Sequence, residues 1–121
     1  MDDAIAAYFE GKPHSYEIFE AVYDRVTGFG PFDVSVASQI SFSVHRKFAW
    51  FWLYNVTKRD PNGVPHIMLL LEERFDDPRV RNIEQVSKNR WNHQIVLRTL
   101  EDGTSEWLRP LLQAAYRLGS K

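Results

Sequence analysis

Residues 48–54 constrain the fold of this chain more than any other stretch, because they read Phe-Ala-Trp-Phe-Trp-Leu-Tyr. Aromatic side chains are enriched in β-strands, where they pack well on a pleated, half-buried surface. Hydrophobic residues make up 44% of the chain and aromatic residues 14%, which is enough to form a core. The sequence therefore predicts a globular protein whose sheet has residues 48–54 as a central strand.

The length of 121 residues fits a single domain spanning residues 1–121. The absence of cysteine excludes disulfides, thiol nucleophiles and cysteine-ligated metal sites. The first residues, Met1 to Ala4, are acidic where a signal peptide would be basic. No apolar run approaches the ~20 residues that span a bilayer. We therefore expect a cytoplasmic protein with no membrane partner.

Three segments have the apolar spacing of amphipathic helices. The first spans residues 2–10 and stops at the Gly-Lys-Pro of residues 11–13. The second starts near His14 or Ser15 and ends at the Gly-Phe-Gly-Pro of residues 28–31. The last follows a predicted turn at residues 101–103 and contains Pro110, where we expect a kink or a loose first turn.

Between these helices the pattern changes to the alternation typical of β-strands. The predicted strands are 34–36, 40–44, 48–54, 66–73, 82–87 and 92–99, with a strong turn signal at residues 60–63. Strands bracketed by helices favour an α+β fold. We predict a two-layer sandwich, with two N-terminal helices and one C-terminal helix on an antiparallel sheet of five to six strands.

The pairing register of strands 40–44 and 48–54 follows from their side-chain patterns. A loop of residues 45–47 would pair Phe42 with Trp50 and Ile40 with Trp52, which makes one face wholly apolar. A two-residue loop would instead place serines opposite the tryptophans. We favour the first register, which puts the tryptophans in the core. The second, mixed face then holds the candidate interface residues Ser41, Ser43, Ala49, Phe51 and Leu53. Either a second copy of the chain, a ligand, or another part of the same chain would cover this face.

Histidine 93 is the most interesting single candidate for chemistry, with Arg90 and Trp91 beside it. A half-buried histidine near an arginine can act as a general base or hold an anionic ligand. It can equally be a core histidine whose hydrogen bonds are satisfied, and no partnered nucleophile or acid is evident. The candidate ligand-binding residues are His93, Arg90, Trp91, Arg46 and Lys47.

Other classes of site have weaker support. The histidines show neither an HxH nor an HExxH spacing, so no metal ligand and no cofactor is predicted. Glu17, Glu20 and Asp24 share one helix face, which is typical of a solvated surface. The net charge of −1 makes nucleic acid an unfavoured partner. We assign no catalytic residue.

A recurring family pattern is present in the segments 8–13, 39–42, 46–53, 91–97 and 114–116, which extend over nearly the whole chain. In these segments the chain resembles the bacterial family called domain of unknown function 5655. The resemblance implies a small bacterial α+β domain, alone or appended to other modules, with no established activity, substrate or cofactor. A basic turn before the aromatic strand and a histidine in the last strand recur in that family. These positions are Arg46, Lys47 and His93 here, whereas Pro110 is a local departure.

Three hypotheses for function follow. The first is a non-enzymatic module that binds a ligand or another protein, with a homodimer through the sheet face as one form. The second is a small enzyme or an anion-binding domain that uses His93 with nearby arginine or lysine side chains. The third is an accessory domain that binds nucleic acid.

Overall fold

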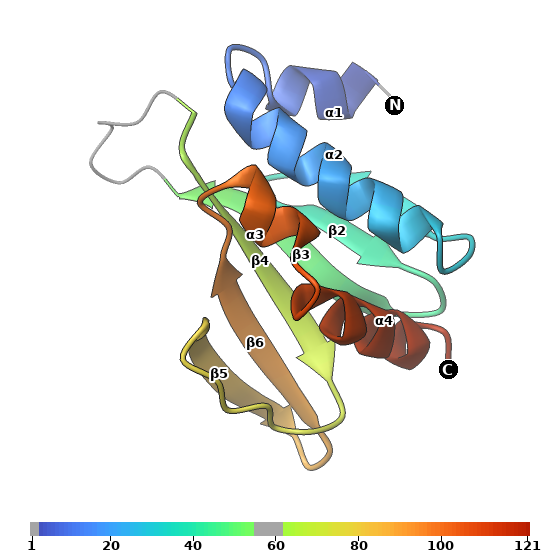
Figure 1. The fold of residues 1–121 in the computed structure, drawn as a ribbon. Coiled ribbons are helices and arrows are strands. Elements are labelled where there is room, and N and C mark those ends of the chain that lie inside the picture. The colour runs from blue at the N-terminus through green and yellow to red at the C-terminus, as the bar shows by residue number, and fades with distance from the viewer. Residues whose placement is uncertain (1–2, 55–61) are drawn as a thin grey trace.

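The computed structural model describes residues 3–54 and 62–121. In this part of the chain four helices lie on one side of a six-stranded sheet (Figure 1). The helices are α1 (Asp3–Tyr8), α2 (Pro13–Thr27), α3 (Leu100–Thr104) and α4 (Leu108–Gly119). The strands are β1 (Asp33–Val36), β2 (Ile40–Ser43), β3 (Lys47–Tyr54), β4 (Val64–Leu71), β5 (Val80–Ser87) and β6 (Arg90–Val96).

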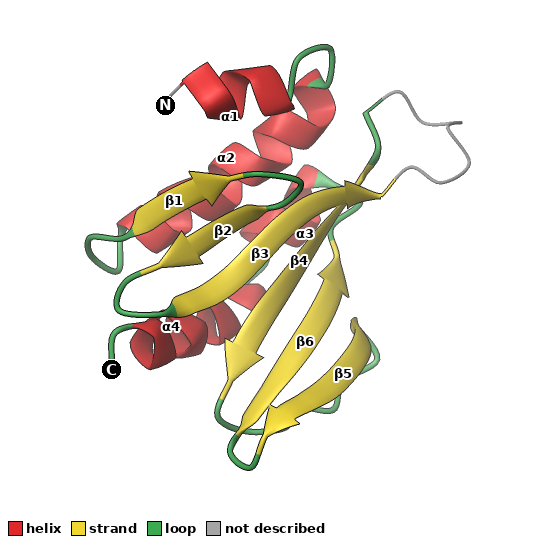
Figure 2. Ribbon diagram, turned by 180° about the vertical axis from the view of Figure 1, so that it is seen from behind, coloured by secondary structure: helices red, strands yellow, loops and turns green. Residues whose placement is uncertain are grey.

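All neighbouring strands are antiparallel, in the order β1-β2-β3-β4-β6-β5. Figure 2 shows the sheet from behind, where no described helix covers it. The predicted α+β fold and antiparallel sheet are therefore confirmed. The predicted turn at residues 60–63 lies largely outside the described residues; of these four, only Asn62 and Gly63 belong to the described part.

Helices α2 and α4 form because their apolar residues repeat at helical spacing and face the sheet. In α2, Ile18, Phe19, Val22 and Val26 are buried. Proline 110 lies in the first turn of α4, which begins at Leu108. A helix leaves its first N–H groups without an intrahelical acceptor, so proline is tolerated there.

Helix α3 was not predicted, because residues 101–103 have the composition of a turn. Its start carries a capping box in which the Thr99 side chain accepts from the Asp102 N–H. The Asp102 carboxylate in turn accepts from the Thr99 N–H at 3.1 Å. This reciprocal pair satisfies two backbone donors and stabilises a helix of only five residues.

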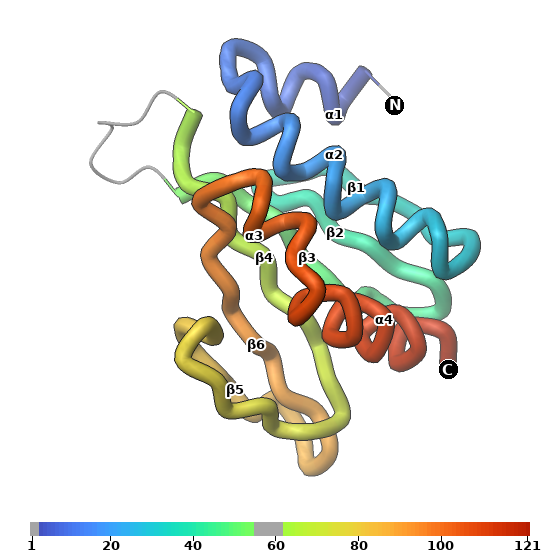
Figure 3. The backbone as a smooth tube through the Cα atoms, viewed as in Figure 1, coloured from blue at the N-terminus to red at the C-terminus, as the bar shows by residue number. Residues whose placement is uncertain are grey.

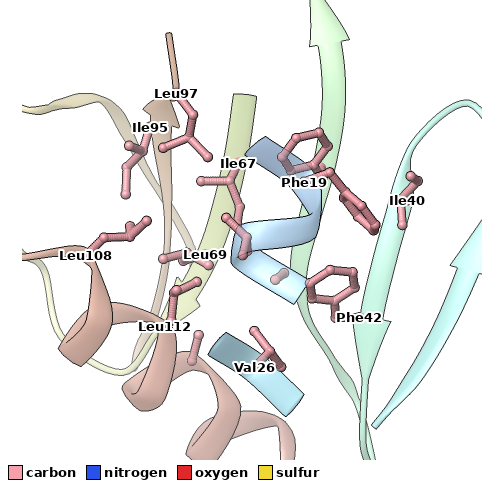
Figure 4. Close-up of a cluster of buried hydrophobic side chains, with 14 of the residues drawn as sticks. Phe19, Val26, Ile40, Phe42, Ile67, Leu69, Ile95, Leu97, Leu108 and Leu112 are labelled. Carbon is pink, nitrogen blue, oxygen red and sulfur yellow. The ribbon is translucent and has the colours of Figure 1, made fainter. Parts of the chain in front are cut away.

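The hydrophobic core lies between the helices and one face of the sheet, called here the covered face (Figure 4). Strand β4 contributes Ile67 and Leu69, and β6 contributes Ile95. Phenylalanine 19 from α2 packs edge-on against Phe51, with ring centroids 5.1 Å apart. The path of the backbone in Figure 3 shows α2 and α4 crossing the sheet side by side over this core.

The predicted register between β2 and β3 is wrong. Ile40 pairs with Phe51, Ser41 with Trp50 and Phe42 with Ala49. A serine, Ser41, therefore lies opposite a tryptophan, as in the register that we did not favour. A β-bulge follows, because Ser43 pairs with Lys47 and leaves Phe48 as the extra residue.

The bulge explains why both Phe48 and Ala49 are buried. Phenylalanine 48 packs beneath α4, where a Cβ on Gly119 would lie only 2.5 Å from its ring. A helix this close leaves no room for indole rings, and a buried indole N–H would need an acceptor. Trp50 and Trp52 therefore lie on the opposite side of the sheet, half-buried.

Candidate functional site

Histidine 93 is completely buried on the covered face of β6. Its Nε2 accepts a hydrogen bond from the Phe75 N–H at 2.9 Å. Its Nδ1 lies 3.1 Å from the carbonyl oxygen of Trp91. A carbonyl can only accept, so Nδ1 carries the proton and both ring nitrogens are occupied.

Burial lowers the pKa of His93 below its usual value, and the charge on Arg74 lowers it further. Backbone hydrogen bonds from Trp91 and Leu69 and the charge on Asp76 act in the opposite direction. The ring is thus neutral at pH 7 and holds the Phe75 backbone in place. It has no free nitrogen with which to act as a general base.

The basic turn between β2 and β3 contacts the end of α4. The N–H groups of His45 and Arg46 lie 2.8 and 3.2 Å from the carbonyl oxygen of Gly119. The last carbonyls of a helix lack intrahelical donors and carry partial negative charge. The backbone of the basic turn therefore caps the last carbonyl group of α4.

Arginine 90 and Trp91 begin β6, and both are half-buried. Trp91 pairs with Leu71 of β4, which belongs to the core. The five predicted ligand-binding residues thus lie on two separate hairpins and on the buried face of β6. None of them lines the cleft described next.

A cleft of about 430 Å³ opens between α4 and the segment that follows β4. Its walls are apolar where they meet the core, with charged side chains around the rim. The lining residues are Leu71, Glu72, Glu73, Arg74, Phe75, Leu111, Ala114, Arg117 and Lys121. The cleft was not predictable from the sequence, because its two walls come from distant segments, residues 71–75 and 111–121. Each segment alone has the pattern of an ordinary surface.

The loop wall of the cleft is fixed at two points. Phenylalanine 75 is held by His93, as described above. Farther along, Arg79 forms an ion pair with Asp77 at 2.7 Å and lies 4.5 Å above the Trp107 ring. The hydrogen bonds from Arg79 lower the pKa of Asp77 to about 2, so this carboxylate stays charged.

The side of the sheet that faces away from the helices carries a second candidate surface, called here the outer face. Its positions are fixed by the register of β2, β3, β4 and β6. Its residues are Ser41, Trp50, Trp52, Tyr54, His66, Met68, Leu70, Asn92, Gln94 and Val96. These ten residues include no charged side chain and hold three aromatic rings besides His66. Lys47 and Arg90 face the same side from the starts of β3 and β6.

Histidine 66 lies in the middle of the outer face, stacked on Trp52 with ring centroids 5.4 Å apart. Its Nδ1 donates to the carbonyl oxygen of Val64 at 2.9 Å, which leaves Nε2 unprotonated. Burial lowers the pKa of His66, and the charges on Arg81 and Arg98 lower it further. Nearby, Asn92 Oδ1 is buried without a hydrogen-bond partner among the described residues.

The predicted interface residues divide between the two faces. Ser41 lies on the outer face, opposite Trp50, and is only 6% exposed, while Ser43 is half-buried beside the bulge. Ala49 and Phe51 are in the core, and Leu53 packs against it. The predicted place on an uncovered face is therefore wrong for Ala49, Phe51 and Leu53, because the register is shifted by one residue. An alternation of serine with large apolar residues in β2 was the available signal for the correct register.

No cluster of three potential metal ligands occurs within residues 3–54 and 62–121. None of the helices in these two ranges is long and apolar enough to cross a membrane. Residues 5–119 match the family model described as a domain of unknown function, DUF5655. No curated protein and no solved structure matches the chain.

Proposed function

The chain belongs to the DUF5655 family, and we propose that it is a non-enzymatic binding module that pairs with a second copy of itself through the outer face of its sheet. The observation that carries this proposal is the composition of that face. Tryptophan, tyrosine and methionine are enriched at the centres of protein interfaces, and charged residues are depleted there. The centre of the outer face has both properties across four strands, with the cations Lys47 and Arg90 at its edge.

A second copy suits this surface for two further reasons. A twofold interface brings identical patches together, and a patch without charge at its centre meets its own image there without repulsion. Packing two sheets face to face buries side chains from both in a layer about 10 Å thick.

The outer face is less suited to the other partners considered. Single-stranded nucleic acid binds where aromatic rings are combined with a cationic groove. The central outward positions of the four strands contain no lysine or arginine, and the two outward cations, Lys47 and Arg90, lie apart at the starts of β3 and β6. Catalysis through His93 is disfavoured because both of its ring nitrogens are occupied within the protein.

Sedimentation equilibrium from about 1 µM to about 1 mM tests the proposal over the range of weak and moderate homodimers. We expect the wild-type protein to change from 14.2 kDa towards twice that mass as concentration rises. The variant Met68→Lys should stay monomeric, because each copy would bury an unpaired lysine in the interface. The control Val86→Lys alters an apolar side chain of β5 that is 47% exposed and outside the outer face, and it should still dimerise. A wild-type protein that stays monomeric throughout would contradict the proposal.

A further inference from the structure

We infer that the cleft between α4 and residues 72–75 is a separate binding site for a small organic monocarboxylate with an apolar body. The cleft lies on the helix side of the molecule, and none of its lining residues belongs to the outer face. The inference therefore does not depend on self-association.

The inner wall of the cleft suits an apolar group. Leu71 is 4% exposed and Leu111 is 8% exposed, and Phe75 packs against the same core. The side chain of Ala114 is small, which keeps the cleft open on the α4 side. The volume of about 430 Å³ falls within the range of small-molecule sites, about 300–1,000 Å³.

The charges at the rim select the polar group of the ligand. Lys121 is paired with Glu72, and Arg74 with Asp76 at 3.0 Å. Among the described residues no carboxylate lies within ion-pair distance of Arg117. An unpaired guanidinium beside an apolar wall is suited to bind a carboxylate through two parallel hydrogen bonds.

The number of charges favours a ligand with one negative group. Three cations and two carboxylates line the cleft, so its net charge is positive by one. The carboxylates Glu72 and Glu73 both stand on the loop wall and would repel a second or third negative charge. Nucleotides and other polyphosphates are therefore disfavoured.

The wall that faces α4 is held in place by the protein itself. Phenylalanine 75 is fixed through its N–H to the buried ring of His93. Binding to a preformed wall avoids the entropy cost of ordering a loop. His93, the strongest candidate from the sequence, thus positions Phe75 in the wall of the cleft. It does not contact the ligand itself, because it is completely buried.

Octanoate is a suitable probe, because it combines an apolar chain with one carboxylate. Its binding can be followed by amide chemical shifts in NMR spectra of the full chain. Octanamide and octylammonium are controls of the same length with neutral and positive head groups. We expect octanoate to shift the resonances of Leu71, Phe75, Leu111 and Arg117, with a Kd of about 1 mM or tighter.

Three variants connect this binding to the cleft. Arg117→Gln should raise the Kd of octanoate by about tenfold, the loss expected for one charged hydrogen-bonded pair. The Kd of octanamide should not change. Ala114→Leu fills the cleft from an exposed helix position and should abolish binding of both. Arg109→Gln changes an exposed arginine of the same helix outside the cleft and should have no effect.

The inference is overturned if octanoate causes no shifts at the cleft up to about 10 mM, or if Ala114→Leu binds it as well as the wild type. It is also overturned if octanamide and octylammonium bind equally well, because the charge of Arg117 would then select nothing. Shifts confined to Trp50, Trp52 and Met68 would place the ligand on the outer face and contradict it too.

Discussion

The covered face and the outer face of this sheet both carry aromatic side chains from β3, yet only one of them is core. On the covered face Phe48 and Phe51 are at most 1% exposed beneath α2 and α4. On the outer face Trp50 and Trp52 are half-buried, with no described helix above them (Figure 2). Aromatic content therefore does not identify the core. The bulge at Phe48 and the close approach of α4 decide which aromatic residues are buried.

The two faces also place a histidine in opposite situations. His93 on the covered face uses both ring nitrogens within the protein. His66 on the outer face uses only Nδ1 among the contacts of the described residues. The first holds a loop in place, and the second is 3% exposed and stacks on Trp52. This contrast suggests a structural role for the covered face and an association role for the outer face.

The largest difference should appear when one aromatic ring is removed from each face. Phe51→Ala should lower the free energy of unfolding by about 3–5 kcal/mol, because it leaves a cavity beside Phe9 and Phe19. Trp52→Ala should lower it by about 1–2 kcal/mol, since the indole is only partly buried and has no described helix above it (Figure 2). Urea denaturation of dilute protein measures both values. Equal losses would show that the two faces do not differ as described.

Adding one methyl group under α4 should also be costly. Gly119→Ala should lower the free energy of unfolding by about 1–3 kcal/mol, because the new Cβ would meet Phe48 at 2.5 Å. In an open helix the same change is stabilising by about 1 kcal/mol. Combining it with Phe48→Leu should recover part of the loss. A gain of stability for Gly119→Ala alone would refute the close contact.

Replacing the two histidines by leucine should separate their roles. His93→Leu leaves the Phe75 N–H buried without an acceptor and should lower the free energy of unfolding by about 1–3 kcal/mol. His66→Leu leaves only the Val64 carbonyl oxygen without its donor. It should lower the free energy of unfolding by less than His93→Leu does. Chemical denaturation at pH 7.5 is the measurement. A larger loss for His66→Leu would reverse the proposed assignment.

The pH dependence of stability follows from the lowered pKa values of both histidines. Above pH ~6.5 each ring is neutral in the folded and unfolded states, and the two contribute no pH dependence. Below it the unfolded chain takes up protons that the folded protein resists, so stability falls towards acid pH. Denaturation at pH 7.5 and 5.5 should show a loss of about 1–2 kcal/mol. Each leucine variant should reduce this loss, and an unchanged slope in both would contradict the assignment.

The smallest effect is expected for a charge on the outer face of the monomer. Met68→Lys should change the free energy of unfolding by about 0.5–1 kcal/mol when the protein is dilute. A lysine can extend along the sheet and keep its ammonium group in water. Denaturation at a concentration below that of self-association tests this value. A loss of several kcal/mol would place Met68 in the core instead.

The sequence was sufficient for the fold class and for most elements, because the apolar periodicity of α2, α4 and the strands is regular. The register of β3 was not predictable from alternation, since the bulge at Phe48 puts two consecutive residues on one face. Helix α3 was missed because its stability depends on the Thr99–Asp102 capping box.

Little of the candidate site could be read from the sequence. His93 was correctly singled out by its position in a strand, but its partner Phe75 lies 18 residues away and donates through its backbone. Such a bond leaves no trace in side-chain patterns. The cleft likewise joins residues 71–75 to α4, and only the folded chain brings its two walls together.

The most direct test of the central claim uses Met68, because the chain has only two methionines and the other is Met1. Protein labelled with ¹³C at its methionine methyl groups is mixed with unlabelled protein at high concentration. An isotope-filtered NOE experiment then reports only contacts between different copies. We predict NOEs from the Met68 methyl group to the indole protons of Trp50 or Trp52 of the unlabelled copy. If the Met68 methyl group shows no intermolecular NOE under conditions where the protein sediments as a dimer, the copies associate elsewhere and the outer face is not the interface.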